Sequence, residues 1–355
     1  MADAFYGLTG QQAVKDKLSE LLRGAARGHA HLFTGEAGTG KFSFARAFAK
    51  ALLCGGGPAD STQSGRPLSP PCGACVSCGL FGSGAHDDYL CIEPTGQGQK
   101  PVIPVDAIRR ITNWIYLRPL YSTRKVCVIA RADHMTEQAQ NALLKTLEEP
   151  PPYGILILTA ASEGMLLETA RSRCAVTRFG GYSDDELSDI LNASDSPPDK
   201  SVTRLFIRLS GGNPGYALEL AGSGTFMSLR GELLNLFCGC LDNDAHSYYM
   251  LPAHLERNRE RFSQQAGIMV HWLRDLWICS VYGTPGTGGF GAEADALISN
   301  GDMAQRLEKY RGRFRPGALL DCMERIDETC SAVAANANFT LAVNAMLYKI
   351  KDLLE

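Results

Sequence analysis

The chain has 355 residues, too many for one compact core, so two or three domains are expected. Apolar residues make up 45% and charged residues 21%, as in an ordinary globular protein, and the net charge of -3 excludes a global basic field for nucleic acid. The N-terminus lacks a basic region followed by an apolar core, and no apolar run approaches the roughly 18 residues of a membrane span. We therefore expect a cytoplasmic protein without a signal peptide or membrane contact.

The first predicted strand, His31–Thr34, leads through a glycine-rich loop into a predicted helix at residues 42–53. The loop reads G-x-x-x-x-G-K, in which glycines let backbone N–H groups face phosphate and the lysine reaches the terminal phosphates of a nucleotide. The alternative is a retained structural loop that binds nothing, or only a stray anion. The candidate nucleotide-binding residues are Gly35, Gly38, Thr39, Gly40 and Lys41.

Both groups that normally hold magnesium in such a site are replaced. Phe42 stands where a Ser or Thr hydroxyl is expected, and the predicted strand Val126–Ile129 continues as Ala130-Arg131 instead of an acidic pair. Ser43 or Asp133 could substitute only through shifts of one or three positions, and Asp133 would then stand past the strand end. The sequence predicts a P-loop architecture without ATP turnover of its own.

Four of the twelve cysteines cluster in the sequence after the P-loop helix: Cys54, Cys72, Cys75 and Cys78. Tetrahedral zinc takes four thiolates, and C-x-x-C spacing lets one tight turn supply two of them. In a reducing compartment this pattern indicates a structural metal site rather than disulfides, with reduced surface thiols as the alternative. His86 competes with Cys54 as the fourth ligand. The Gly/Pro/Ser-rich insert Gly55–Pro71 is expected to be a flexible loop.

Further predicted strands, Tyr89–Ile92 and Ile155–Leu158, alternate with helical stretches, which favours a parallel α/β sheet over residues 1–180. Residues 136–149 form an amphipathic helix that Pro150 ends. Beyond residue 181 the pattern is helical, with linkers near residues 180 and 222 and a break at Gly283–Gly291. Ser183 to Glu186 reads as a helix start.

Two basic features remain. An arginine at the rim of a P-loop domain can reach a neighbouring subunit's nucleotide, so Arg173 in Ser172-Arg173-Cys174 is a candidate, and a solvated surface arginine is the alternative. A weak basic tract could contact phosphates or could be a solvated helix face. It comprises Arg109, Arg110, Arg118, Arg124, Lys125 and Arg131.

Together these features resemble subunits of the bacterial replicative clamp loader, in the AAA+ superfamily, over nearly the whole chain. The resemblance rests on the order of five motifs as well as on each one. They are the opening segment Gly7–Gln11, the inserted cysteine cluster, the run Asn141–Pro150, the arginine-finger motif Ser172–Cys174, and Asn336–Asn338 followed by Leu341-Ala342.

Two kinds of subunit share this pattern. The gamma/tau motor keeps both magnesium-holding motifs and an arginine in its lid, whereas the delta-prime subunit keeps the Ser-Arg-Cys finger but has a degenerate nucleotide site. Phe42, Ala130-Arg131 and Gly215 depart from the motor pattern, Gly215 standing where the lid arginine is expected. The resemblance therefore favours delta-prime, with an ATP-hydrolysing gamma/tau-type motor as the alternative.

This resemblance implies three domains. They are a RecA-like AAA+ domain at residues 1–180 with a zinc module at about 54–80, a helical lid at 181–222, and a helical collar at 225–355 that assembles into a ring. Arg173 would act in trans as a catalytic finger in the neighbouring gamma/tau site during loading of the sliding clamp in DNA replication.

The implied cofactor is structural zinc, and whether ATP occupies the chain's own loop is left open. The implied partners are gamma/tau and delta, with the sliding clamp and primer–template DNA reached through the assembled ring of the DNA polymerase III holoenzyme. A further rival is a zinc-dependent DNA-binding module on an inactive P-loop domain, which would bind DNA alone in a salt-sensitive manner.

Overall fold

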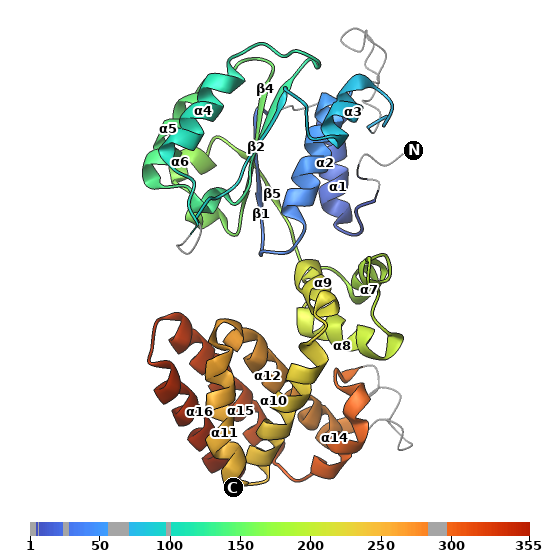
Figure 1. Ribbon diagram of the computed structural model, residues 1–355, viewed down its shortest axis with the longest axis vertical. Helices are drawn as coiled ribbons and strands as arrows, with labels where there is room; N and C mark the ends of the chain where they lie inside the picture. The colour runs from blue at the N-terminus through green and yellow to red at the C-terminus, as the bar shows by residue number, and fades with distance from the viewer. Residues whose placement is uncertain (1–4, 6, 24–27, 56–70, 97–100, 283–296) are drawn as a thin grey trace. The chain divides into compact units, whose positions relative to one another are not determined.

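The computed structural model describes residues 5, 7–23, 28–55, 71–96, 101–282 and 297–355. They form two compact units (Figure 1). Unit 1 runs to Glu186 and includes Asn213–Gly215, and unit 2 comprises Leu187–Gly212 and Tyr216–Glu355. The predicted flexible insert, apart from its two end residues, and the predicted break at Gly283–Gly291 lie outside the described residues. The separation of lid from collar stays a prediction.

Unit 1 is built on a parallel five-stranded sheet with strand order β2-β3-β4-β1-β5. All four predicted strands are present, so the expected α/β fold class is confirmed. The fifth was not predicted, because its sequence Ala-Val-Thr-Arg spans only four positions, ends in two polar residues and contains no apolar run. The strands are β1 (Ala30–Thr34), β2 (Tyr89–Ile92), β3 (Lys125–Ile129), β4 (Gly154–Ala160) and β5 (Ala175–Arg178).

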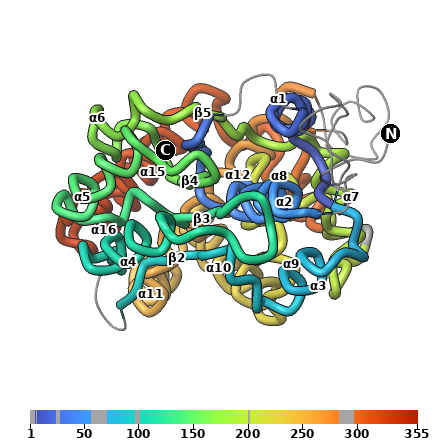
Figure 2. The backbone as a smooth tube through the Cα atoms, turned by 90° about the horizontal axis from the view of Figure 1, so that it is seen from above, coloured from blue at the N-terminus to red at the C-terminus, as the bar shows by residue number. Residues whose placement is uncertain are grey.

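Helices cover both faces of this sheet (Figures 1 and 2). On one face, Leu32, Ile129 and Leu158 pack in a core with α4 (Val105–Ile115), α5 (Glu137–Glu148) and α6 (Glu168–Arg171). On the other face, Phe33, Val128 and Ile157 pack with α1 (Gln12–Arg23) and α2 (Lys41–Leu53). Because the central strands are buried on both faces, they read in the sequence as continuous apolar runs.

Local signals set the ends of the elements in unit 1. The Thr136 hydroxyl accepts a hydrogen bond from the Ala139 N–H at 3.2 Å, which caps α5 one residue inside the predicted range. Ser183 and Glu186 form a reciprocal capping box at the start of α7 (Asp184–Asn192), with distances of 2.9 and 3.2 Å. Shorter elements are α3 (Val76–Gly82), η1 (Ala132–His134) and η2 (Glu163–Met165).

The described part of unit 2 contains helices and no strand, as the sequence predicts. The α-helices after α7 are α8 (Lys200–Ser210), α9 (Pro214–Gly222), α10 (Phe226–Leu241), α11 (Ala245–Arg257), α12 (Phe262–Tyr282), α14 (Ala304–Tyr310), α15 (Pro316–Ala334) and α16 (Phe339–Leu354). Two short helices are η3 (Arg259–Arg261) and η4 (Gly301–Met303). The fold class expected for this part, all-α, is therefore confirmed.

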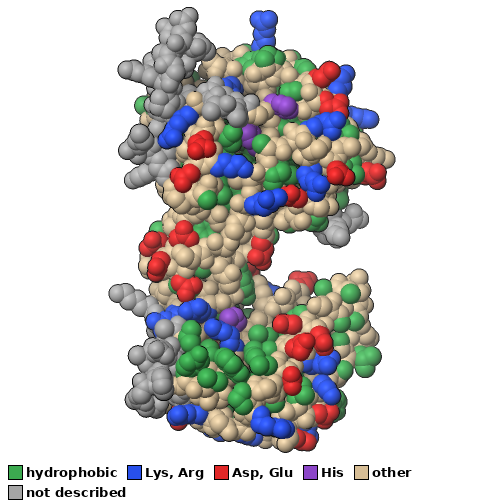
Figure 3. Space-filling view, turned by 180° about the vertical axis from the view of Figure 1, so that it is seen from behind, with side chains coloured by type: hydrophobic (Ala, Val, Ile, Leu, Met, Phe, Trp, Pro, Cys, Tyr) green, Lys and Arg blue, Asp and Glu red, His purple; other side chains and the backbone are tan. Residues whose placement is uncertain are grey.

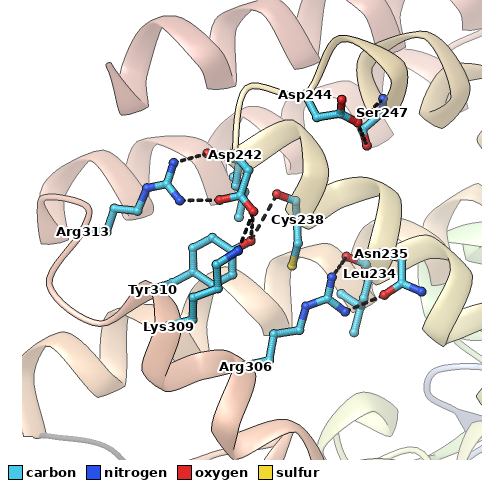
Figure 4. A network of polar contacts seen from close by, with 11 residues as sticks. Leu234, Asn235, Cys238, Asp242, Asp244, Ser247, Arg306, Lys309, Tyr310 and Arg313 are labelled. Carbon is cyan, nitrogen blue, oxygen red and sulfur yellow. Dashed lines mark hydrogen bonds and ion pairs between the residues drawn. The ribbon is translucent and has the colours of Figure 1, made fainter.

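Polar contacts fasten α14 to α10 in unit 2 (Figure 4). Asp242, just after α10, accepts hydrogen bonds from Lys309 at 2.9 Å, from the Tyr310 hydroxyl at 2.8 Å, and from Arg313. Although burial opposes it, these hydrogen bonds lower the pKa of Asp242 to about 2. Arg306 also donates to α10 through its guanidinium.

Hydrophobic side chains gather on one face of unit 2 (Figure 3). A groove on this unit is lined by Trp277, Ile278, Leu297, Leu320 and Met323, together with Arg274 and Tyr282. Leu320 is itself largely exposed. Across the described residues, no helix combines the length and the apolar character needed to cross a membrane.

Candidate functional site

The glycine-rich loop lies between the end of β1 at Thr34 and the start of α2 at Lys41. Gly35, Gly38 and Gly40 have φ angles of 149°, 88° and 84°, in the region that side chains rarely adopt. At Gly35 a Cβ atom would lie 2.6 Å from the Phe179 carbonyl oxygen, so a side chain there would collide with the backbone. The folded geometry thus requires the residue type that the sequence pattern singled out.

Lys41 is turned onto the loop itself. Its side chain is buried, and Nζ donates to the carbonyl oxygens of Gly35 and Glu36, each at 2.6 Å. Burial lowers its pKa, while the nearby Asp133 carboxylate opposes that shift. The Thr39 hydroxyl likewise donates to the Glu36 carbonyl at 2.8 Å. The ammonium that would meet phosphate is therefore held by acceptors of the loop.

A cavity of about 510 Å³ lies beside the loop, at the carboxyl ends of β1, β3 and β4, where ligands bind in open α/β sheets. Phe42 lines it in place of a magnesium-holding hydroxyl. Arg131 brings a guanidinium, which lies 3.0 Å from His134 Nε2. A positive charge there opposes binding of a divalent cation.

Ser43 and Asp133 also line this cavity, although the sequence analysis gave little weight to either. Asp133 does stand past the end of β3, as expected, and lies in η1, which places it beside the loop at the carboxyl edge of the sheet. Its Oδ1 atom is buried without a hydrogen-bond partner among the described residues. The Asp133 carboxylate therefore belongs to the cavity, although the spacing after the strand did not predict it.

Residues 213–215, far along the chain, rest on the loop. The Gly215 N–H donates to the Gly38 carbonyl at 3.0 Å, and the Asn213 amide donates to the Ala37 carbonyl at 2.6 Å. A Cβ atom on Gly215 would lie 2.7 Å from Gly38 Cα. An arginine cannot stand at this position unless the loop moves. Gly215 was predicted to replace the lid arginine, but no feature of the sequence predicts its contact with the loop.

The four predicted metal ligands come together. Their Sγ atoms all lie within 4.8 Å of one another, and Cys54 lies 3.6 Å from both Cys72 and Cys78 and 3.9 Å from Cys75. A zinc ion with bonds of about 2.3 Å to four thiolates spaces the sulfurs about 3.8 Å apart. These separations fit a tetrahedral metal site and are far longer than the roughly 2 Å of a disulfide.

The thiols of this cluster differ in pKa. Backbone N–H groups of Ala74 and Cys75 lower the pKa of Cys72 to about 6, whereas burial raises the pKa of Cys78 to about 12. A bound cation would favour the thiolate at all four. His86, the alternative ligand, lies outside the cluster, and its Nδ1 atom accepts from the Asp88 N–H at 3.1 Å.

Arg173 lies on the turn between α6 and β5, with its side chain 36% exposed. Its Nη1 atom donates to the Thr169 carbonyl at 2.6 Å, and its Nη2 atom lies 2.6 Å from Glu148 Oε1 at the end of α5. No role was predicted for Glu148 from the sequence, although it belongs to the run Asn141–Pro150. Nearby Arg171, 38% exposed, pairs with Glu168 instead.

The predicted basic tract includes residues with their own structural roles. Lys125 is buried, donates to the Trp114 carbonyl at 3.2 Å, and lies 4.1 Å above the Trp114 ring. Arg109 pairs with Asp106 on the exposed side of α4 at 3.3 Å. Arg131 lines the loop cavity. These three cations therefore have separate surroundings, and contact of the tract with phosphates stays a prediction.

Comparison with known proteins gives the family. A family model described as "DNA polymerase III, delta subunit" matches residues 10–182. The delta' subunit of DNA polymerase III from Bacillus subtilis is 30% identical over 255 residues, which cover 72% of this chain and 70% of that protein. This chain belongs to the DNA polymerase III delta-prime family.

Two more relatives place the chain within the wider group. The delta' subunit from Pseudomonas aeruginosa is 35% identical over 210 residues, and that match spans 58% of this chain and only 60% of the relative. The tau subunit of Bacillus subtilis is 35% identical over 170 residues, 48% of this chain and 28% of that protein. The chain thus shares part of its sequence with the gamma/tau type as well, as the sequence motifs indicated.

Proposed function

We propose that this chain is an ATPase-inactive delta-prime subunit of a cytoplasmic bacterial clamp loader. It would present Arg173 to the ATP site of an adjacent gamma/tau subunit while the sliding clamp is loaded during DNA replication. The observation that carries this proposal is the contrast within unit 1. Arg131 and Phe42 line the chain's own cavity where magnesium-holding groups are expected, whereas Arg173 lies half-exposed on a turn.

The proposed partners follow from this role. Gamma/tau would receive the finger, delta would join the same ring, and the sliding clamp and primer–template DNA would be reached through the assembly. The exposed apolar side chains on unit 2 are suited to packing against helices of other subunits, which supports a collar at residues 225–355 beyond a lid at 181–222.

ATP hydrolysis by a ring assembled from this chain, gamma/tau and delta tests the proposal. Arg173→Ala should lower turnover on the order of 10³-fold, as loss of other arginine fingers does. Arg171→Ala is the matched control, because Arg171 is equally exposed two residues away and pairs with a different carboxylate. The isolated chain should be inert. Hydrolysis by the isolated chain with magnesium would support the gamma/tau-type motor instead.

We also propose that the cysteine cluster holds a structural zinc ion. Purified protein should contain about one zinc per chain, and Cys54→Ser should lose it because three thiolates leave the tetrahedral site open. Cys330→Ser, in unit 2 and outside the cluster, is the control. His86→Ala should retain the metal. Retention by Cys54→Ser together with loss by His86→Ala would assign the fourth ligand to His86.

A further inference from the structure

The guanidinium of Arg173 is held from two sides. The Thr169 carbonyl, one turn earlier in α6, accepts from Nη1 at 2.6 Å. The Glu148 carboxylate, on a different helix, lies 2.6 Å from Nη2. Glu148 therefore provides the one charged anchor that the described structure gives to this side chain. The pair joins the C-terminal end of α5 to the turn before β5.

An arginine side chain that must act at a distance gains from such an anchor. A free arginine side chain samples many rotamers, and a charge-assisted contact to a fixed carboxylate removes part of that freedom in advance. With Glu148 on one edge of the planar guanidinium, its other N–H groups keep a defined direction. Both side chains remain partly exposed, 36% for Arg173 and 48% for Glu148, so the pair lies at the surface where a neighbour can approach.

We propose that Glu148 is a positioning residue for Arg173. Its carboxylate orients the guanidinium so that the finger enters a neighbouring subunit's nucleotide site in a productive direction. This inference rests on the proposed finger function. Glu148 itself touches no substrate in this scheme and acts entirely through Arg173.

The experiment measures steady-state ATP hydrolysis by the ring with Glu148→Ala, Glu148→Gln and the double variant Glu148→Ala/Arg173→Ala. Glu148→Ala should lower kcat about tenfold, because small errors in orientation can cost up to about 10²-fold. The KM for ATP should stay unchanged, since the finger acts on the transition state. Glu148→Gln keeps an acceptor oxygen and should recover part of the rate. The double variant should match Arg173→Ala within about twofold, because Glu148 acts only through that residue.

Glu168→Ala is the matched control, because it removes the neighbouring pair with Arg171 and leaves Arg173 anchored. Its turnover should equal that of the wild type. A wild-type rate for Glu148→Ala, or a faster one that marks the pair as a restraining latch, would overturn the inference. So would an additional loss in the Arg173→Ala background. If Arg173→Ala itself has no effect, the finger function fails, and that failure is separate from any result on Glu148.

Discussion

The loop cavity and the turn that carries Arg173 lie in the same unit but differ in how exposed their cationic side chains are. In the cavity, Lys41 is buried against two carbonyls of its own loop, and residues 213–215 rest on that loop. On the turn, Arg173 keeps more than a third of its side chain exposed beside one carboxylate. A P-loop can therefore serve as scaffold at one place while the same unit keeps a charged group available at another.

Replacing Lys41 gives the sharpest contrast between the two regions. In the assembled ring, Lys41→Met should leave ATP turnover within about twofold of wild type, against the 10³-fold loss expected for Arg173→Ala. The isolated chain should nevertheless lose about 1–3 kcal/mol of unfolding free energy, because the partly buried hydrogen bonds from Lys41 to the Gly35 and Glu36 carbonyls are lost. Turnover assays and urea unfolding provide the measurements. A loss of turnover comparable to that of Arg173→Ala would show that the chain's own site works.

Gly215 tests how tightly residues 213–215 fit the loop. Gly215→Ala puts a Cβ atom 2.7 Å from Gly38 Cα, whereas Gly222→Ala, at the other end of α9, meets nothing within 4 Å. Both gain similar helix propensity, so Gly215→Ala should be less stable than Gly222→Ala by about 1–3 kcal/mol. Equal unfolding free energies for the two variants in urea would mean that the segment does not clamp the loop.

The pH dependence of the unfolding free energy tests the burial of His31 in β1, the strand that leads into the loop. His31 in β1 is buried, and this burial lowers its pKa from 6.5 to about 4. The unfolded chain binds the proton first as pH falls, so the stability that neutral His31 provides is present above pH 6.5 and is lost toward pH 4. Between pH 8 and pH 5 the loss should be about 2 kcal/mol.

His31→Leu should remove this part of the pH dependence, as measured by urea unfolding at the two pH values. His29→Leu is the control, since it lies two residues earlier and outside the strand. An unchanged pH dependence in His31→Leu would show that another group carries the effect. His271 in unit 2, whose pKa burial also lowers to about 4, is the group to test next.

Some features followed directly from local sequence. The loop glycines, the cap at Thr136 and the capping box at Ser183 depend on residues within a few positions of one another, so spacing alone predicts them. Strands β1, β3 and β4 were predicted because burial on both faces demands continuous apolar runs. The edge strand β2 is only half-buried, yet Tyr89–Ile92 still reads as an apolar run. Strand β5 was missed because its sequence, Ala-Val-Thr-Arg, contains no such run.

Contacts between residues far apart in the chain could not be predicted from the sequence. Asp133 and the loop residue Lys41 line one cavity although 92 positions separate them, and strand spacing does not encode that meeting. The same holds for the contact of Gly215 with Gly38 and for the pair of Glu148 with Arg173, which join residues 177 and 25 positions apart. Cys54 needed the fold as well, because cysteines 18 positions apart in the sequence need not lie close together in space.

The sequence by itself determined the α/β and helical fold classes, the P-loop and the spacing of Cys72, Cys75 and Cys78, while Arg173 was singled out only through the resemblance to a family. It did so because residue type and short-range spacing fix backbone conformation and ligand chemistry. Only the tertiary structure decided what surrounds each of these groups. Which carbonyls hold Lys41, what rests on the loop and what anchors Arg173 depend on packing between elements that chain order leaves open.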